Sequence, residues 1–173
     1  MKRTSMLIII LLFITVTAVA VTVWTLFLRE DTVILAPDYA PIETEPNAEP
    51  IPNDSGNKLE APEGGGAVSL TYSNQVSVGL RENAASLLFA NPGKSNHDIV
   101  IQIVIQETVV AQSGTLHPGH QVTELSLLPG ANKLLIPGIY EGEFLVFYYS
   151  METGEKAIVN TQIPIRIAVT ESL

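Results

Sequence analysis

The stretch DIVIQIVIQ, residues 98–106, decides the fold. Isoleucine stands at every second position from 99 to 105. A period of two in β-branched residues is typical of a half-buried β-strand. The same alternation recurs along the chain, and turn sequences rich in Pro, Gly and Asn separate the segments. We therefore predict strands at residues 76–80, 84–90, 98–106, 108–112, 121–128, 140–150 and 157–169.

About seven short strands in about 100 residues predict an all-β fold, an antiparallel β-sandwich. Pro164 lies in the last of these strands and has no N–H to donate. This strand should therefore be an edge strand or carry a bulge at that position. The run PGIYEG, residues 137–142, leads directly into the strand at 140–150 and places Tyr140 to act as a tyrosine corner.

On these features, roughly residues 68–170 resemble bacterial immunoglobulin-like and fibronectin type III-like domains. The runs NPGKSN (residues 91–96) and YYSMETGEKAIVNTQIPI (residues 148–165) are also similar to membrane-anchored surface proteins of Firmicutes. The sequence departs from the immunoglobulin pattern because it has no cysteine, and its one tryptophan, Trp24, lies far from the domain. The resemblance implies an Ig-like β-sandwich and no specific activity.

The strands at 98–106 and 140–150 also predict a surface for protein contact. If Phe144 and Val146 face the core, alternate residues face outward and form an apolar, aromatic patch. Such patches often mark interaction sites. Alternatively, these side chains are scattered, or are covered by the preceding part of the chain. The candidate protein-contact face comprises Val100, Val104, Leu145, Phe147 and Tyr149.

Residues 6–28, MLIIILLFITVTAVAVTVWTLFL, contain no charge and no proline. As a helix they would reach roughly 34 Å, enough to cross a hydrocarbon core of about 30 Å. Lys2 and Arg3 precede the run and an acidic stretch follows it, so the positive-inside rule predicts a cytoplasmic N-terminus. We expect a signal anchor in the plasma membrane, with the lipid bilayer as partner of residues 6–28 and the remaining chain extracytoplasmic. The alternative is a signal peptide cleaved after Ala20.

Residues 29–66 are predicted to form a disordered linker. They contain six prolines and end in Gly64-Gly65-Gly66. They also carry nine acidic residues against Arg29 and Lys58. Proline removes backbone donors and like charges extend a chain, so both features oppose regular structure. The sequence thus divides into residues 1–28 (short cytoplasmic tail and anchor), 29–66 (linker) and 67–173 (β-sandwich domain).

The sequence contains only weak motifs for catalysis or for metal binding. His117-x-x-His120 is the best metal candidate, but it needs a third ligand, and Glu124 or His97 would have to converge on it by folding. A tight turn at Pro118-Gly119 is the simpler explanation of this run. Glu141 and Glu143 share a strand face, as solvated carboxylates commonly do. We expect no catalytic, metal or cofactor site. The net charge of −9 makes nucleic acid an unfavourable partner.

The sequence therefore favours a non-enzymatic, single-pass membrane protein that presents an Ig-like domain for protein–protein interaction. An envelope or surface protein would be the partner, and the most specific version is a subunit of an envelope-spanning assembly. The alternative is a cell-wall or carbohydrate-binding module that stacks sugars on Phe147, Tyr148 or Tyr149.

Overall fold

The computed structural model describes residues 11–19, 22, 35–54, 57–61 and 65–173. It divides into two units, Met1–Val33 and Ile34–Leu173. In the first unit, residues 11–19 and 22 are helical. Within the described residues, no helix is both long and apolar enough to span a bilayer. The rest of the predicted anchor, residues 6–10, 20–21 and 23–28, lies outside the described residues.

The second unit is mostly β-structure, which confirms the prediction of a β-rich domain in its coarse form. The seven predicted strands correspond to β3–β9, with end shifts of a few residues. The sequence patterns missed two short strands and one short helix. The elements are β1 (Ala48–Pro50), β2 (Thr71–Tyr72), β3 (Gln75–Gly79), β4 (Ala84–Asn91), β5 (His97–Ile105), β6 (Thr108–Gln112), β7 (His120–Ser126), α2 (Ala131–Leu134), β8 (Gly138–Ser150) and β9 (Lys156–Thr170).

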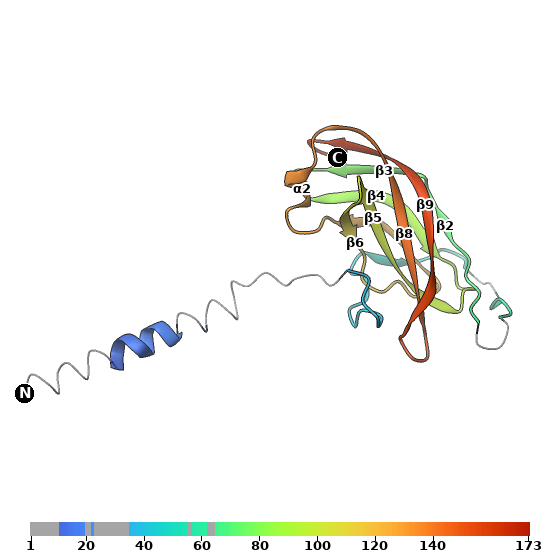
Figure 1. Cartoon of the computed structure of the whole chain (residues 1–173). Coiled ribbons are helices and arrows are strands. Elements are labelled where there is room, and N and C mark those ends of the chain that lie inside the picture. The colour runs from blue at the N-terminus through green and yellow to red at the C-terminus, as the bar shows by residue number, and fades with distance from the viewer. Residues whose placement is uncertain (1–10, 20–21, 23–34, 55–56, 62–64) are drawn as a thin grey trace, which may run out of the picture. The chain divides into compact units, whose positions relative to one another are not determined.

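These strands form one curled sheet (Figure 1). Their order in it is β1-β7-β4-β3-β9-β8-β5-β6, and β2 pairs with β4 beside this path. Neighbouring strands are antiparallel except β3 and β9, which are parallel. A sandwich of two separate sheets was expected. The structure differs because β3 pairs with β4 on one side and with β9 on the other, and so joins both halves by hydrogen bonds.

The core lies between the two halves of the curled sheet. The isoleucines of β5 that alternate in the sequence are fully or almost fully buried, as their spacing predicts. Phe89 of β4 and Phe144 of β8 meet edge to face, with ring centroids 5.1 Å apart, and neither side chain is exposed to solvent. This ring pair therefore connects the half that contains β4 with the half that contains β8.

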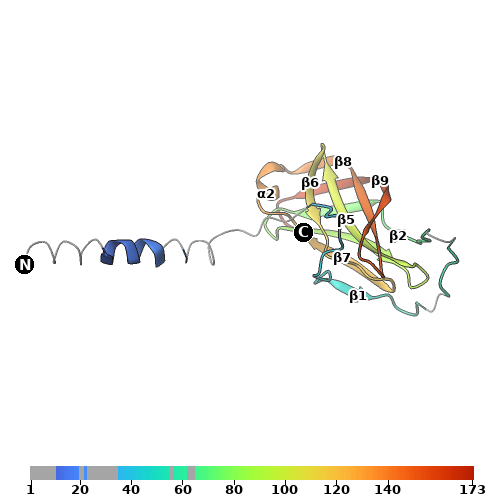
Figure 2. The same ribbon diagram turned by 60° about the horizontal axis from the view of Figure 1, so that its bottom comes forward.

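The predicted linker is wrong for residues 35–54, which pack on the domain. Tyr39 forms a bridge with Glu155, Thr44 forms one with Thr115, and β1 pairs with β7. Figure 2 shows β1 beside β7. The prolines do not prevent this pairing, because the backbone between them still donates and accepts, and Pro50 lies in an edge strand. The folded domain thus begins well before residue 67.

Pro164 lies at an open part of β9, as its missing donor predicted. β3 pairs with β9 only from Arg166 to Thr170. The register between β8 and β9 shifts between the pairs Phe147–Asn160 and Tyr149–Lys156, so the bulge lies at residues 157–159 and Pro164 itself pairs regularly with Glu143. Within the described residues, the part of β9 before Arg166 therefore has a strand neighbour on the β8 side alone.

The core ring pair can be tested by Phe144→Ala. This change removes a fully buried ring and leaves a cavity, so the free energy of unfolding should fall by about 3–5 kcal/mol. The measurement is urea unfolding followed by circular dichroism. Leu88→Ala on the exposed side of β4 is the control and should cost less than about 1 kcal/mol. Equal losses in both variants would contradict the position of Phe144 at the centre of the core.

Candidate functional site

The residues of the predicted protein-contact face lie on one side of β5 and β8, but most of them are not exposed to solvent as expected. Val100 pairs with Phe147, and Tyr149 pairs with Asp98, so these side chains share the outer side of β5 and β8. Val100 and Tyr149 are 0% exposed and Val104 is 7% exposed. Leu145 and Phe147 are half-buried. The expectation of a solvent-exposed patch is therefore wrong for Val100, Val104 and Tyr149.

The segment of residues 36–41 crosses this outer face. The Tyr149 hydroxyl donates to the Pro37 carbonyl at 3.0 Å. The Lys156 ammonium donates to the Ala36 carbonyl at 2.7 Å, and its backbone N–H donates to the Asp38 carbonyl. Coverage by the preceding part of the chain was the alternative left open by the sequence, and it is what the structure shows. The outer face of β5 and β8 is thus a second, intramolecular packing layer.

Tyr149 is the titratable group most affected by this layer. Burial raises the pKa of Tyr149 to about 12 from 10.0, and the nearby negative charge of Asp38 adds to the shift. Both causes disfavour the phenolate. The neutral hydroxyl is therefore the form that holds the segment of residues 36–41 in place.

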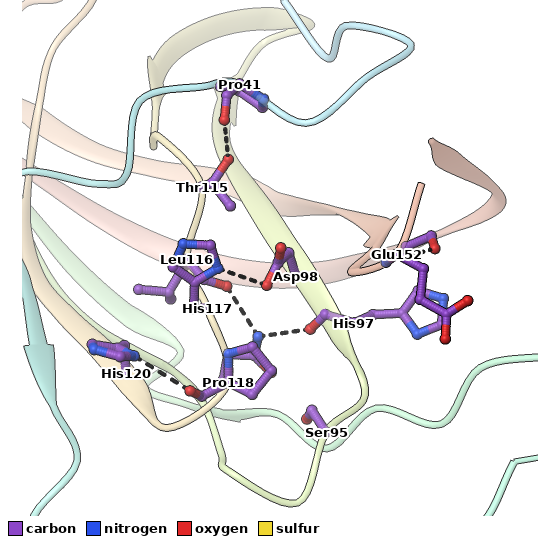
Figure 3. A network of polar contacts seen from close by, with 12 residues as sticks. Pro41, Ser95, His97, Asp98, Thr115, Leu116, His117, Pro118, His120 and Glu152 are labelled. Carbon is purple, nitrogen blue, oxygen red and sulfur yellow. Dashed lines mark hydrogen bonds and ion pairs between the residues drawn. The ribbon is translucent and has the colours of Figure 1, made fainter. Parts of the chain in front are cut away.

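A network of polar contacts joins the ends of β4 and β5 to the loop before β7 (Figure 3). The buried Asn91 side chain donates to the carbonyls of His97 and Leu116, each at 3.0 Å. His117 Nδ1 lies 2.8 Å from Asp98 Oδ1. Thr115 Oγ1 donates to the Pro41 carbonyl at 2.7 Å, which ties the N-terminal segment to the same network.

The pair His117 and His120 does not form part of a metal site in the described residues. The Nδ1 atom of each ring already has a partner, Asp98 for His117 and the Pro118 carbonyl for His120. The ring of His97 points toward Glu152, away from the other two histidines (Figure 3). The described residues contain no group of three or more side chains that could hold a metal ion. The network instead stabilises the loop.

Glu141 and Glu143 lie on the outer side of β8, opposite Arg166 and Pro164 of β9. Glu141 is exposed and Glu143 is half-buried. The arrangement is that of solvated carboxylates on a strand face.

The exposed apolar surface beside the open part of β9 is a feature that the sequence patterns missed. Ile158 is fully exposed and Val159 is 68% exposed, although Val159 shares the period of two with the buried residues Ile163 and Ile165. The bulge in β9 changes the direction of these side chains. Beside them lies a groove of about 230 Å³, lined by Gly66, Val68, His97, Tyr148, Ala157 and Val159. The only signal in the sequence was Pro164, which predicted an edge without locating what lies beside it.

A second exposed apolar group lies between α2 and the start of β8. Leu134, Ile136 and Ile139 are each more than 60% exposed. Tyr140, the predicted tyrosine corner, donates its hydroxyl proton to the Ile136 carbonyl at 3.0 Å. A bond from this hydroxyl to the backbone a few residues upstream is what a tyrosine corner makes. The bond holds the connection between α2 and β8 against the strand.

No protein family matches the sequence, and no curated protein does. Among solved structures, the chain is similar to AggA, the major subunit of aggregative adherence fimbriae type I from Escherichia coli. The identity is 14% and the TM-score is 0.30, over 66% of this chain and all of that chain. A likeness of this extent carries no argument about function, which must come from the surface described above.

The cover over β5 and β8 can be tested by Tyr149→Phe. This change leaves the Pro37 carbonyl without its donor and should cost about 1 kcal/mol of unfolding free energy. Because the folded-state pKa of Tyr149 is raised, the contribution of its hydroxyl is complete below pH 10. It should disappear as the pH rises from about 10 to about 12.

The measurement is the difference in unfolding free energy between the wild type and Tyr149→Phe, taken at each pH so that other titrating groups cancel. Tyr72→Phe, which removes a hydroxyl from an exposed ring, is the matched control. A difference that stays constant from pH 9 to pH 12 would show that the Tyr149 hydroxyl is not buried against the segment of residues 36–41.

Proposed function

We propose that the chain is a single-pass membrane protein that presents an extracytoplasmic, immunoglobulin-like β domain for protein–protein contact. In its most specific form it is a subunit of an envelope-spanning or surface assembly. One observation carries the contact role, namely the open part of β9 with exposed Ile158 and Val159 beside an apolar groove. The proposal assigns no reaction and no cofactor to the domain.

The immunoglobulin-like assignment is supported by three features. Antiparallel strands form two facing halves around one core. The pair β8 and β9 forms a long hairpin in the position of the last two strands of such domains. Tyr140 makes its corner bond at the start of that hairpin.

The membrane assignment is supported by residues 6–28 and by the charges that flank them. The described domain has many exposed polar side chains and a net negative sequence, which suit an aqueous compartment. The proposed orientation has a cytoplasmic N-terminus, because Lys2 and Arg3 precede the apolar run.

Protein contact is favoured over sugar binding because the aromatic side chains of β8 do not form one platform. Phe147 and Tyr149 lie on one side of the strand and Tyr148 lies on the other. The Tyr149 ring is buried, and the Phe147 ring has the Lys156 ammonium 5.9 Å from its centre. The Tyr148 hydroxyl bonds to Thr161 Oγ1 at 2.6 Å. A sugar ring would need an accessible aromatic face, which this arrangement does not present as a group.

The orientation can be tested with a C-terminal epitope tag on the full chain in bacterial cells. The tag should stay with the membrane after alkaline extraction and should be cut by protease added to intact spheroplasts. A chain without residues 6–28 should lose the membrane fraction and serves as the control. A tag that resists protease until the membrane is broken would overturn the proposed orientation.

The contact role can be tested by chemical crosslinking of the full chain in intact cells. Defined protein adducts should form, and Ile158→Lys should reduce them at least tenfold, because an edge charge opposes strand pairing. Ile136→Lys is the matched control, since Ile136 is also exposed but lies near the Val169 end of β9, away from Ile158. Recovery of cell-wall fragments in place of protein adducts would favour a glycan-binding role.

A further inference from the structure

The exposed apolar group between α2 and the start of β8 is held toward solvent by its neighbours. Ala131 and the adjoining Leu135 are buried, so this segment cannot turn to bury Leu134 in their place. The hydroxyl of Tyr140 holds the carbonyl of Ile136, which fixes the connection to β8. The result is a fixed apolar surface, here called the α2 surface, made of Leu134, Ile136 and Ile139.

Ile139 of the α2 surface lies on the side of β8 that residues 36–41 cross further along the strand. Alternate residues of a strand face the same side, so Ile139 shares this side with Leu145 and Tyr149. Six residues separate Ile139 from Leu145, which corresponds to about 20 Å along the strand.

The covering segment runs along β8 in the direction away from the α2 surface. Ala36 donates its N–H to the side chain of Gln112, which lies at the level of Leu145 in the sheet. Further on, Ala40 donates its N–H to the carbonyl of Gly154, in the turn between β8 and β9. The segment therefore enters this face from the end of the domain that carries the α2 surface.

The spacing between the apolar run and the domain limits how far this face can lie from a membrane. The proposed anchor ends at Leu28, and Leu35 is the first described residue of the domain. The seven residue steps between them can span at most about 25 Å. The distance along β8 from the entry of the segment to the α2 surface is similar, about 20 Å. The α2 surface is therefore within reach of the bilayer that would hold the anchor.

Charge distinguishes the two ends of the domain as membrane contacts. α2 and the turn between β8 and β9 lie at opposite ends (Figure 1). Residues 125–140, which include the α2 surface, contain no acid and one base, Lys133. Residues 151–155 of the turn contain Glu152 and Glu155 and no base. Because a carboxylate is costly to bring into an apolar layer, the end with the α2 surface fits a bilayer better.

Acids on neighbouring elements indicate that the lipid contact is with neutral lipid. Glu141 lies two positions after Ile139 and stands opposite Arg166 of β9. Glu107 lies in the turn that joins β5 to β6, at the same end of the sheet. Lys133 alone does not make this end basic, so anionic headgroups are not attracted. Aliphatic side chains would instead enter the boundary between headgroups and acyl chains.

We propose that the α2 surface docks on the bilayer that holds the anchor, with Leu134, Ile136 and Ile139 at the boundary between headgroups and acyl chains. This inference rests on the proposed function, because residues 6–28 bring the domain to that bilayer. Three aliphatic side chains bind weakly by themselves, and the anchor supplies the effective concentration that they need. Docking of this end leaves Ile158, at the other end of β9, away from the bilayer and open to a protein partner.

The chain has no cysteine, so a fluorescent label on Ile136→Cys reports the surroundings of the α2 surface in the full chain. The chain is placed in phosphatidylcholine vesicles, where the emission of this label should shift to shorter wavelength. Nitroxide lipid should quench it roughly threefold more than the same label on Ile158→Cys, and most strongly when the nitroxide lies near the headgroup. Ile158→Cys is the matched control, because Ile158 is an equally accessible isoleucine at the other end of β9.

The double change Leu134→Asp and Ile139→Asp in the labelled chain should remove most of the additional quenching at position 136. Thr123→Asp on exposed β7 adds one acid elsewhere and should leave the quenching unchanged. Anionic lipid added to the vesicles should not increase the quenching, and an increase would overturn the contact with neutral lipid.

Equal quenching at positions 136 and 158 in a chain that stays in the vesicles at alkaline pH would overturn the docking alone. Emission at shorter wavelength without quenching by nitroxide lipid would show that a second copy covers the α2 surface, and would also overturn it. Release of the chain from the vesicles at alkaline pH would overturn the membrane assignment and the docking with it. The crosslinking test of the contact role is independent, because these changes lie away from Ile158.

Discussion

The double pairing of β3 is the constraint on which the rest of the domain depends. Gln75–Gly79 pair in parallel with the end of β9 and, from Ser77 onward, antiparallel with β4. This short strand joins the half of the sheet that contains β4 to the half that contains β9, and Phe89 meets Phe144 across the core between them. Before Gln75 the chain turns to β4 as β2, and β9 loses its second neighbour. The same constraint therefore produces both the closed core and the open edge.

The N-terminal segment changes which surface is available. Residues 36–41 use backbone carbonyls to bind Tyr149 and Lys156, and β1 then pairs with β7. An apolar outer face that would otherwise meet solvent becomes an internal contact. The surface that stays exposed includes a strand edge, the part of β9 before Arg166.

Much of the fold could be predicted because alternation is a local property. The isoleucines of β5, the long strands β8 and β9 and the corner at Tyr140 all follow from spacing and turn residues. The candidate site was predicted less well. Val100, Val104 and Tyr149 were placed on the correct face, but no local signal indicates that a segment about sixty residues or more away in sequence will cover it. Val159 is exposed although it shares the period of two with buried Ile163 and Ile165, because a bulge interrupts that period between Lys156 and Asn160.

The β-rich class, the positions of the strands and the strand edge at Pro164 could be predicted from the sequence, since each depends on a residue and its near neighbours. The tertiary structure alone decided that β3 joins both halves, that residues 36–41 cover the outer face, and that β9 stays open before Arg166. These are pairings between distant segments. They are set by which backbone and apolar groups find partners in the folded chain, and the period of a single strand carries no information about its neighbour.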